Sequence, residues 1–259
     1  MTDELEFAEE LARRAGQLLL GCFSHSGSPT STKKDRSVVT EADLEADRLI
    51  RTAILEKYPG DGVVTEELET IYPAGRRAVW VVDPLDGTTN FSLGLPIWGV
   101  SIARLVDGWP ETAALYFPPL NEVYLAQKGQ GAYFNGERLH INPAQKINTT
   151  TFFACCSRTH QRYDVQIPYK PRILGSAAFN LCCVARGMAV LSFEAVPKLW
   201  DLSAAWLVAR EAGAVIESLD DSQPFPPVPG LDYAGMSFPT LAAPTQEYIL
   251  KGRKNIKPR

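Results

Sequence analysis

Long apolar segments are missing from this chain, and their absence restricts where it can act. No uninterrupted apolar run approaches the roughly 18 residues that a membrane-spanning helix requires. The first residues, MTDELEFAEELARRAG, are acidic and amphipathic, unlike the start of a secretory signal. The five cysteines include two adjacent pairs but lack C-x2-C spacing, which is typical of reduced thiols rather than a metal site. We therefore expect a cytoplasmic protein that does not associate with a membrane.

An excess of positive charge is also missing. The 26 lysines and arginines are outnumbered by 30 aspartates and glutamates, which gives a net charge of −4. Such a chain has no general attraction to nucleic acid, so no nucleic-acid partner is expected. With 259 residues and 45% hydrophobic composition, the chain can bury a full core as one large domain or two subdomains.

Hydrophobic periodicity changes character near residues 142–148. Before that point, apolar residues at helical spacing predict helices over 4–22 and 40–57. The Asn135-Gly136 pair predicts a hairpin turn. Short strands are predicted at 61–66, 78–82, 97–106, 111–117 and 121–126. Their close spacing favours an antiparallel sheet.

Strands and helices alternate in the second half of the chain. Strands are predicted at 152–156, 190–193 and 214–217, and helices at 175–186, 201–212 and 244–252. A proline-rich surface connection over 223–239 precedes the last helix. The alternation favours βαβ units. We expect a helix-plus-antiparallel-sheet subdomain over residues 1–145 and an α/β subdomain over 146–259.

Two carboxylates lie close together in the stretch WVVDPLDGTTNF. Asp83 ends an apolar strand and Asp86 follows three residues later, so two unneutralised charges would repel and a cation is expected between them. Gly87 allows a ligand to approach the backbone, and free N–H groups of a helical turn that begins near Thr88 would suit a phosphate. An Asp-Gly turn with a capping Asp is the simpler alternative.

The spacing of these acids separates the motif from phosphatases that use an aspartyl nucleophile of the haloacid dehalogenase type. Those enzymes carry D-x-D-G-T, whose acids lie on one face of a strand, whereas D-P-L-D-G-T needs a turn to bring its acids together. Instead, DPLDGTTNF resembles a signature of the inositol monophosphatase family, the lithium-sensitive, magnesium-dependent phosphatases related in fold to fructose-1,6-bisphosphatase. Other blocks of that family are resembled, in order, by VVTEAD (38–43), VVTEEL (63–68), LGSAAFNLCCVARG (174–187) and LWDLSAAWLVAREAGA (199–214).

The resemblance implies a mixed α and β fold, a layered α-β-α-β-α sandwich, and a phosphomonoesterase that works with two or three Mg²⁺ ions. One ion would be held by Glu66, Asp83 and the backbone carbonyl of Leu85. A second would be held by Asp83, Asp86 and Asp201, so that Asp83 bridges the two. Residues 1–145 would then carry most of the metal ligands, and 146–259 would carry Asp201 and the substrate contacts.

The same resemblance implies the other site residues. Catalytic roles fall to Asp43, Glu66 and Thr88, with Thr88 and Asp43 orienting and deprotonating the attacking water. The amides of Gly87 and Thr88 would hold the phosphate. The implied substrate contacts are Glu66, Leu85, Asp86, Gly87, Thr88, Gly175, Ser176, Ala177, Glu194 and Asp201.

Structural roles remain open for several of these residues. Asp43 lies three residues after Thr40 in a pattern like a capping box, and both roles can coexist. Asp201 precedes an apolar helical stretch and could simply cap that helix. Lys33 or Lys34 could approach the phosphate or remain solvated.

The substrate is the least determined feature of the sequence. Inositol-1-phosphate or a similar polyol or sugar monophosphate is expected. Family members also hydrolyse histidinol phosphate, fructose-1,6-bisphosphate and 3′-phosphoadenosine 5′-phosphate, and they share the metal-binding residues. This sequence departs from the family pattern in ACCSRT (154–159), where cysteines replace a serine that often contacts the substrate. A regulatory binding protein with the same fold is the alternative, although the complete set of implied metal ligands favours an enzyme. The resemblance also implies a homodimer.

Overall fold

A large sheet forms the centre of the N-terminal half. The computed structural model describes every residue except 1, 25, 28–29, 33–37 and 143–149. Among the described residues the sheet has seven strands in the order of the chain. These are β3 (Gly62–Thr65), β4 (Ala78–Asp86), β5 (Gly99–Val106), β6 (Trp109–Phe117), β7 (Glu122–Gln127), β8 (Gly131–Phe134) and β9 (Glu137–Leu139). β3 pairs with β4 in parallel, and the other neighbours are antiparallel.

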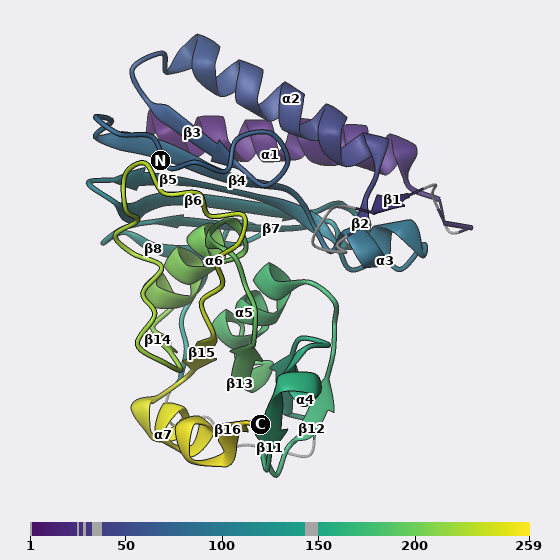
Figure 1. The fold of residues 1–259 in the computed structure, drawn as a ribbon, viewed down its shortest axis with the longest axis vertical. Helices are drawn as coiled ribbons and strands as arrows, with labels where there is room; N and C mark the ends of the chain where they lie inside the picture. The colour runs from purple at the N-terminus through teal and green to yellow at the C-terminus, as the bar shows by residue number, and fades with distance from the viewer. Residues whose placement is uncertain (1, 25, 28–29, 33–37, 143–149) are drawn as a thin grey trace.

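Helices cover both faces of this sheet (Figure 1). α1 (Asp3–Cys22) and α2 (Glu41–Lys57) lie on one face, and α5 (Ala177–Ala185) and α6 (Leu199–Glu211) lie on the other. Alternate residues of β4 therefore enter different cores: Trp80 and Val82 pack with α1 and α2, and Val79 and Val81 pack with α5 and α6. Burial on both faces explains why this strand is a continuous apolar run rather than an alternating one.

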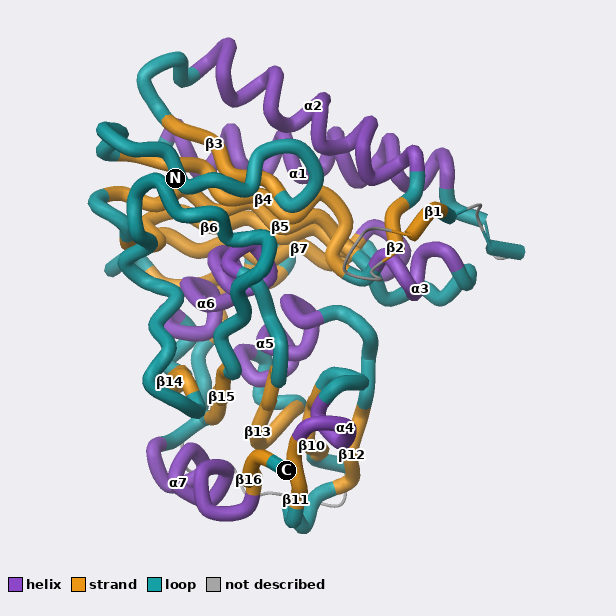
Figure 2. Tube along the Cα trace, viewed as in Figure 1, coloured by secondary structure: helices purple, strands orange, loops and turns teal. Residues whose placement is uncertain are grey.

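A second, mixed sheet forms the C-terminal half. Its order among the described residues is β12 (Lys170–Arg172), β10 (Phe152–Cys155), β13 (Ala189–Glu194), β15 (Thr240–Ala243) and β14 (Val215–Ser218). α5 and α6 separate this sheet from the first one, and α7 (Gln246–Asn255) lies beyond it, as the tube view in Figure 2 shows. The layers therefore run α-β-α-β-α, and the predicted fold class is confirmed.

Small elements complete the chain. β1 (Ser31–Thr32) pairs with β2 (Val38–Val39), and β11 (Tyr163–Val165) pairs with β16 (Ile256–Pro258). Three short helical turns connect longer elements, namely α3 (Thr88–Ser92), η1 (Pro118–Leu120) and α4 (Thr159–Arg162). No helix in the described part of the chain is both long and apolar enough to cross a bilayer.

Most predicted elements are present, but two expectations about pairing were wrong in part. The first sheet is not wholly antiparallel, because β3 joins β4 in parallel. In the second sheet β10 and β13 are parallel around α5, as a βαβ unit requires, but β15 is antiparallel to both of its neighbours. β15 lies between the predicted proline-rich connection, which ends at 239, and the predicted last helix, which begins at 244, where no element was predicted. Its four residues, Thr-Leu-Ala-Ala, carry little strand propensity. The predicted subdomain boundary at 145/146 falls outside the described residues and stays a prediction.

Two glycines on α1 provide a test of how this helix packs. A Cβ added at Gly16 would lie 2.5 Å from the Tyr116 ring and 2.8 Å from Pro118, whereas nothing lies within 4 Å of the same atom at Gly21. We expect Gly16→Ala to lower the free energy of unfolding by about 1–3 kcal/mol through overpacking. The matched control Gly21→Ala should raise it by about 0.5–1 kcal/mol through helix propensity. Urea denaturation followed by circular dichroism measures both, and a stabilised Gly16→Ala would contradict the packing described.

Candidate active site

The end of β4 brings two acids to one edge of the first sheet. The register between β4 and β5 shifts between Asp83 and Asp86, so a bulge in a continuing strand, rather than the expected turn after residue 82, changes the direction of the chain. Asp83 accepts a hydrogen bond from the N–H of Leu85 at 2.9 Å. Gly87 follows with φ +98°, and a Cβ there would lie 2.9 Å from the carbonyl oxygen of Ile97. Glycine is therefore required at this position. α3 begins directly after it at Thr88, where the sequence predicted a helical turn.

Three carboxylates from different parts of the chain converge beside this turn. Glu66 follows β3, Asp83 is on β4 and Asp201 is on α6, and one oxygen from each lies within 4.8 Å of the others. Carboxylate oxygens are the ligands that Mg²⁺ prefers. Within the described part of the chain, no lysine or arginine forms an ion pair with Asp83, Asp86 or Asp201. The donor set therefore fits a divalent cation.

Asp86 lies beside this cluster but faces the N-terminus of α5. Its carboxylate accepts hydrogen bonds from the N–H groups of Ala177 and Ala178, both at 3.1 Å, and from the hydroxyl of Ser176. The positive end of the helix dipole stabilises a carboxylate in this position. Ser176 is only 2% exposed, so its hydroxyl connects Asp86 to α5 rather than lining the cavity.

Burial and mutual repulsion disfavour the charged forms of these acids. Burial, followed by the charges of Glu66, Asp86 and Asp201, raises the pKa of Asp83 well above its ordinary value. Burial raises the pKa of Asp86 to about 6, although the hydrogen bonds from Ser176 and α5 oppose the shift. Burial, with the charges of Glu66 and Asp86, raises the pKa of Asp201 to about 8. A bound cation would favour the ionised carboxylates and reverse these shifts.

Asp201 occupies a capping position that differs from the one expected. α6 begins at Leu199, two residues earlier than predicted, so Asp201 is the third residue of the helix. Its carboxylate accepts a hydrogen bond from the N–H of Lys198 at 2.7 Å. Asp201 therefore caps α6 by accepting from a backbone N–H at the start of the helix, while its carboxylate also lies near those of Glu66 and Asp83. A capping role and a metal-binding role of Asp201 are therefore compatible.

Asp43 combines a capping bond with a bond toward the cavity. Its Oδ2 accepts a hydrogen bond from the N–H of Thr40 at 2.8 Å, which completes the predicted capping box at the start of α2. Its Oδ1 accepts a hydrogen bond from the hydroxyl of Thr88 at 3.2 Å, and the same hydroxyl lies 3.0 Å from the carbonyl oxygen of Leu85. Burial raises the pKa of Asp43 in spite of the hydrogen bonds from Thr40.

A cavity of about 290 Å³ opens in front of these groups. Glu66, Asp83, Leu85, Asp86, Gly87, Thr88, Gly175 and Asp201 line it. Three further lining residues, Thr89, Ser157 and Arg158, were not predicted as contacts. Ser157 and Arg158 lie directly after the adjacent cysteines of ACCSRT, a segment that the sequence marked as unusual without indicating which side chain faces the site.

Glu194 lies outside the lining of this cavity. It is 1% exposed and accepts a hydrogen bond from the side-chain amide of Asn180 at 2.7 Å. Burial, then the proximity of the Cys156 thiol, raises its pKa well above the ordinary value. Ala177 also is not among the lining residues, while Lys33 and Lys34 lie outside the described residues. Asn180 was missed by the sequence analysis, because an asparagine inside an apolar helix has no local signal for its partner.

Comparisons with known proteins agree with this arrangement. The chain matches the inositol monophosphatase family over residues 1–253. A histidinol-phosphatase of Chlorobaculum parvum is 34% identical over 82% of this chain and 85% of its own length. A fructose-1,6-bisphosphatase/inositol-1-monophosphatase of Thermotoga maritima is 32% identical over 83% of this chain and 84% of its own length. A solved IMPase structure from Thermotoga maritima superposes with a TM-score of 0.78 at 26% identity, covering 98% of this chain and 97% of that one.

A family match over nearly the whole chain, together with the converging acids and the glycine turn, leads to one conclusion. The chain belongs to the inositol monophosphatase family and is a phosphoric monoester hydrolase.

Proposed function

We propose that this protein hydrolyses a small polyol or sugar monophosphate, with inositol-1-phosphate as the preferred substrate, in a magnesium-dependent reaction. The observation that carries the proposal is the convergence of Glu66, Asp83 and Asp201 within 4.8 Å beside the N-terminus of α3. Cation ligands next to free helix N–H groups suit a phosphate ester that bridges metal and backbone. A cavity of about 290 Å³ is suited to a small metabolite rather than a macromolecule.

The proposed metal ligands divide into two overlapping groups. Glu66, Asp83 and the Leu85 carbonyl would hold one Mg²⁺, and Asp83, Asp86 and Asp201 would hold another, with a third weaker ion near Glu66. The chemistry supplied by bound Mg²⁺ is Lewis acidity, which favours hydroxide near neutral pH and neutralises charge on the leaving oxygen. The hydrogen bonds from α5 to Asp86 and from Lys198 to Asp201 hold these carboxylates in orientation.

Thr88 and Asp43 are proposed to position and deprotonate the attacking water. The Thr88 hydroxyl already donates toward Asp43 Oδ1, so a proton from water can pass to this pair. The Thr40 bonds fix the carboxylate from behind. The N–H groups of Gly87 and Thr88 would bind phosphoryl oxygens, where charge accumulates in the transition state. Because water attacks directly, no covalent phosphoenzyme is formed.

The leaving alcohol is proposed to occupy the side formed by the second half of the chain. Gly175 lines the cavity there, next to Ser157 and Arg158. Ser176, Ala177 and Glu194 support this side from behind in the structure described, and we propose that they contribute to substrate recognition. Histidinol phosphate and fructose-1,6-bisphosphate are the alternative substrates, since relatives carry both names. 3′-Phosphoadenosine 5′-phosphate is a further alternative.

A regulatory binding role is the second candidate function. The observation that favours it is the name of two relatives, Nus factor SuhB of Vibrio cholerae and of Escherichia coli, each 34% identical to this chain.

We further propose that the protein is a cytoplasmic homodimer and that lithium inhibits it. Its two subdomains are proposed to divide near 145/146. No partner other than the phosphorylated metabolite and a second copy of the chain is included in the proposal.

Phosphate release from a substrate panel tests the proposed activity. The panel contains inositol-1-phosphate, histidinol phosphate, fructose-1,6-bisphosphate and 3′-phosphoadenosine 5′-phosphate, each with Mg²⁺, with a chelator and with added lithium. We expect fastest release from inositol-1-phosphate, dependence on Mg²⁺ and inhibition by lithium. Absence of turnover on every ester, with Mg²⁺ still bound by calorimetry, would favour the regulatory role instead.

Two hydroxyl residues on α3, Thr88 and Ser92, provide a test variant and a matched control for the proposed role of Thr88 in activating water. Thr88→Ala removes the bond to Asp43 and should lower kcat by about 10²–10⁴-fold, the usual contribution of a general base system. Ser92→Ala removes a hydroxyl that bonds only locally to the Thr89 carbonyl, so its kcat should change less than about twofold. Steady-state kinetics and thermal melts of both variants separate catalysis from folding. Equal activity of the two variants would exclude Thr88 from the reaction.

The raised pKa values predict how pH changes the stability of the metal-free protein. Asp86 and Asp201 have folded-state pKa values of about 6 and about 8 against an ordinary 3.8. Their stabilising contribution is complete below the unfolded-state pKa and is lost as pH rises through the folded-state values. The Tm in a chelator should therefore fall between about pH 5 and about pH 8.5, and the rise in Tm on adding Mg²⁺ should grow over that range. Asp201→Asn should make both the Tm in a chelator and the rise in Tm on adding Mg²⁺ less dependent on pH. A rise in Tm on adding Mg²⁺ that is the same at every pH would contradict this link between ionisation of the acids and metal binding.

A further inference from the structure

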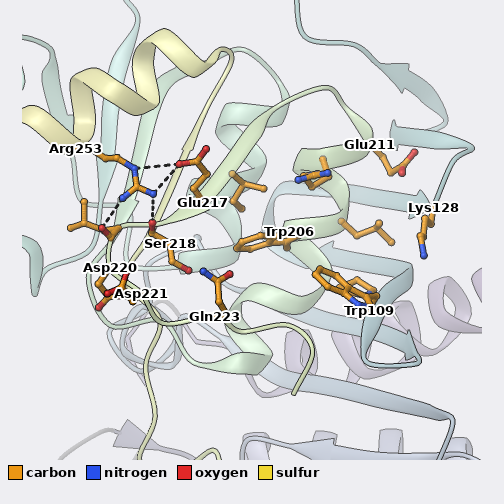
Figure 3. Close-up of a pocket in the computed structure, with 15 residues that line it drawn as sticks. Trp109, Lys128, Trp206, Glu211, Glu217, Ser218, Asp220, Asp221, Gln223 and Arg253 are labelled. Atoms are coloured by element: carbon orange, nitrogen blue, oxygen red, sulfur yellow. Dashed lines mark hydrogen bonds and ion pairs between the residues drawn. The ribbon is translucent and has the colours of Figure 1, made fainter. Parts of the chain in front are cut away.

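A second cavity lies at the other end of α6 and is larger than the catalytic one. Its volume is about 580 Å³, against about 290 Å³ for the cavity of the acids. The lining comes from the start of β6, the C-terminal half of α6, β14 and the segment that follows β14 (Figure 3). No residue lines both cavities. A volume of this size falls within the range of small-molecule sites.

α6 connects the two cavities. Asp201 is near the N-terminal end of the helix, while Trp206 and Arg210 face the second cavity from its C-terminal half. Asp201 and Arg210 are nine residues apart, which corresponds to roughly 14 Å along the axis. A molecule bound in the second cavity would therefore not meet the catalytic groups, although it would contact the same helix.

Aromatic rings form one wall of the second cavity. Trp109 is 48% exposed, which is unusual for a large aromatic side chain without a partner on its outer face. The buried Phe225 ring supports it from behind at a centroid distance of 6.4 Å and contacts Trp206 at 5.5 Å. In the view of Figure 3 the Trp206 ring lies between Trp109 and the Ser218–Gln223 pair. These faces suit a flat heterocyclic ring, and stacking of a base on such a ring contributes about 1–3 kcal/mol.

An amide side chain next to this wall can bond to a ligand. Gln223 lines the cavity, and its side-chain amide can donate and accept hydrogen bonds on the edge of a ligand that lies against the aromatic rings.

One lining cation is available to pair with an anionic group on that ligand. Lys128 is paired with Glu111 at 2.8 Å, and Arg253 is paired with Glu217 at 2.9 Å and also donates to the backbone. Arg210, at the end of α6, forms no ion pair within the described residues. Lining carboxylates outnumber lining cations among these residues, so a triphosphate would be repelled, whereas one phosphate can pair with Arg210.

We propose that the second cavity binds a purine nucleoside monophosphate, separately from the catalytic site. The base stacks on Trp109 and Trp206, the Gln223 amide bonds to the edge of the base, and Arg210 pairs with the phosphate. An amide side chain of this type is well suited to the donor and acceptor on an adenine edge. This proposal does not depend on the substrate of the catalytic site, because no residue is shared between the cavities.

Calorimetric titration with AMP tests the proposal. The full-length protein is titrated in a chelator, so that the catalytic site holds no metal to bind phosphate. Adenosine and ribose 5-phosphate are the comparison ligands, and we expect each to bind about tenfold more weakly than AMP because each lacks one of the two anchors. Arg210→Gln should weaken AMP about tenfold and leave adenosine unchanged, whereas Trp109→Ala should weaken AMP and adenosine alike.

Control variants make a negative result informative. Arg14→Gln on the exposed face of α1 should leave AMP affinity unchanged, and Trp109 is exposed enough that its replacement should not prevent folding. Hydrolysis in Mg²⁺ without AMP should be the same for Arg210→Gln as for the unaltered chain. The proposal is overturned if AMP gives no binding at about 5 mM, far above the affinity expected of a built site. It is equally overturned if Arg210→Gln has no effect on AMP while Asp201→Asn abolishes binding, since AMP would then occupy the catalytic cavity.

Discussion

Repulsion among buried carboxylates is the constraint on which the rest of this structure depends. Asp83 and Asp86 are on β4, Glu66 follows β3 and Asp201 is on α6. Burial and the charges of neighbouring carboxylates make Asp83 and Asp201 harder to ionise. The fold offsets this repulsion with backbone N–H groups at helix starts. The N-terminus of α5 donates to Asp86, and the N–H of Lys198 before α6 donates to Asp201. The N–H of Thr40 before α2 donates in the same way to Asp43. The starts of three helices therefore supply N–H donors that stabilise the acids at this site.

Sequence reasoning was strongest where the chemistry is local. The helical turn that begins near Thr88 and the Thr40–Asp43 cap are each written in a few adjacent residues, and the structure has both. Helix spacing also placed α1 and α2 within one residue at each end. Pairing between distant segments had no such signal. β15 is short and rich in alanine, so nothing in its composition indicated a strand between β13 and β14.

Side-chain direction was the second thing that the sequence did not determine. Ser176 and Glu194 were predicted to meet the substrate, yet in the fold described they are buried and bond to Asp86 and Asn180. Ser157 and Arg158 line the cavity instead, from a loop whose conformation depends on the second sheet. The cavity at the far end of α6 joins Trp109 to Trp206 and Ser218, which come about a hundred residues later in the chain, and only the packed layers bring them together. The phosphatase family was therefore predictable from motifs, whereas the side chains that line each cavity depend on tertiary packing.

The position of β15 in the second sheet has a consequence for the order of events during synthesis. This strand contains residues Thr240–Ala243 and joins β13 to β14, so the sheet cannot form completely until these residues have left the ribosome. α5 and α6, which donate to Asp86 and carry Asp201, are supported by that sheet on one side. A nascent chain that has formed only the first sheet and its covering helices α1 and α2 would therefore lack the support that holds Asp201 and the N–H groups facing Asp86 in place. Emergence of β15 would complete the sheet and fix both carboxylates together.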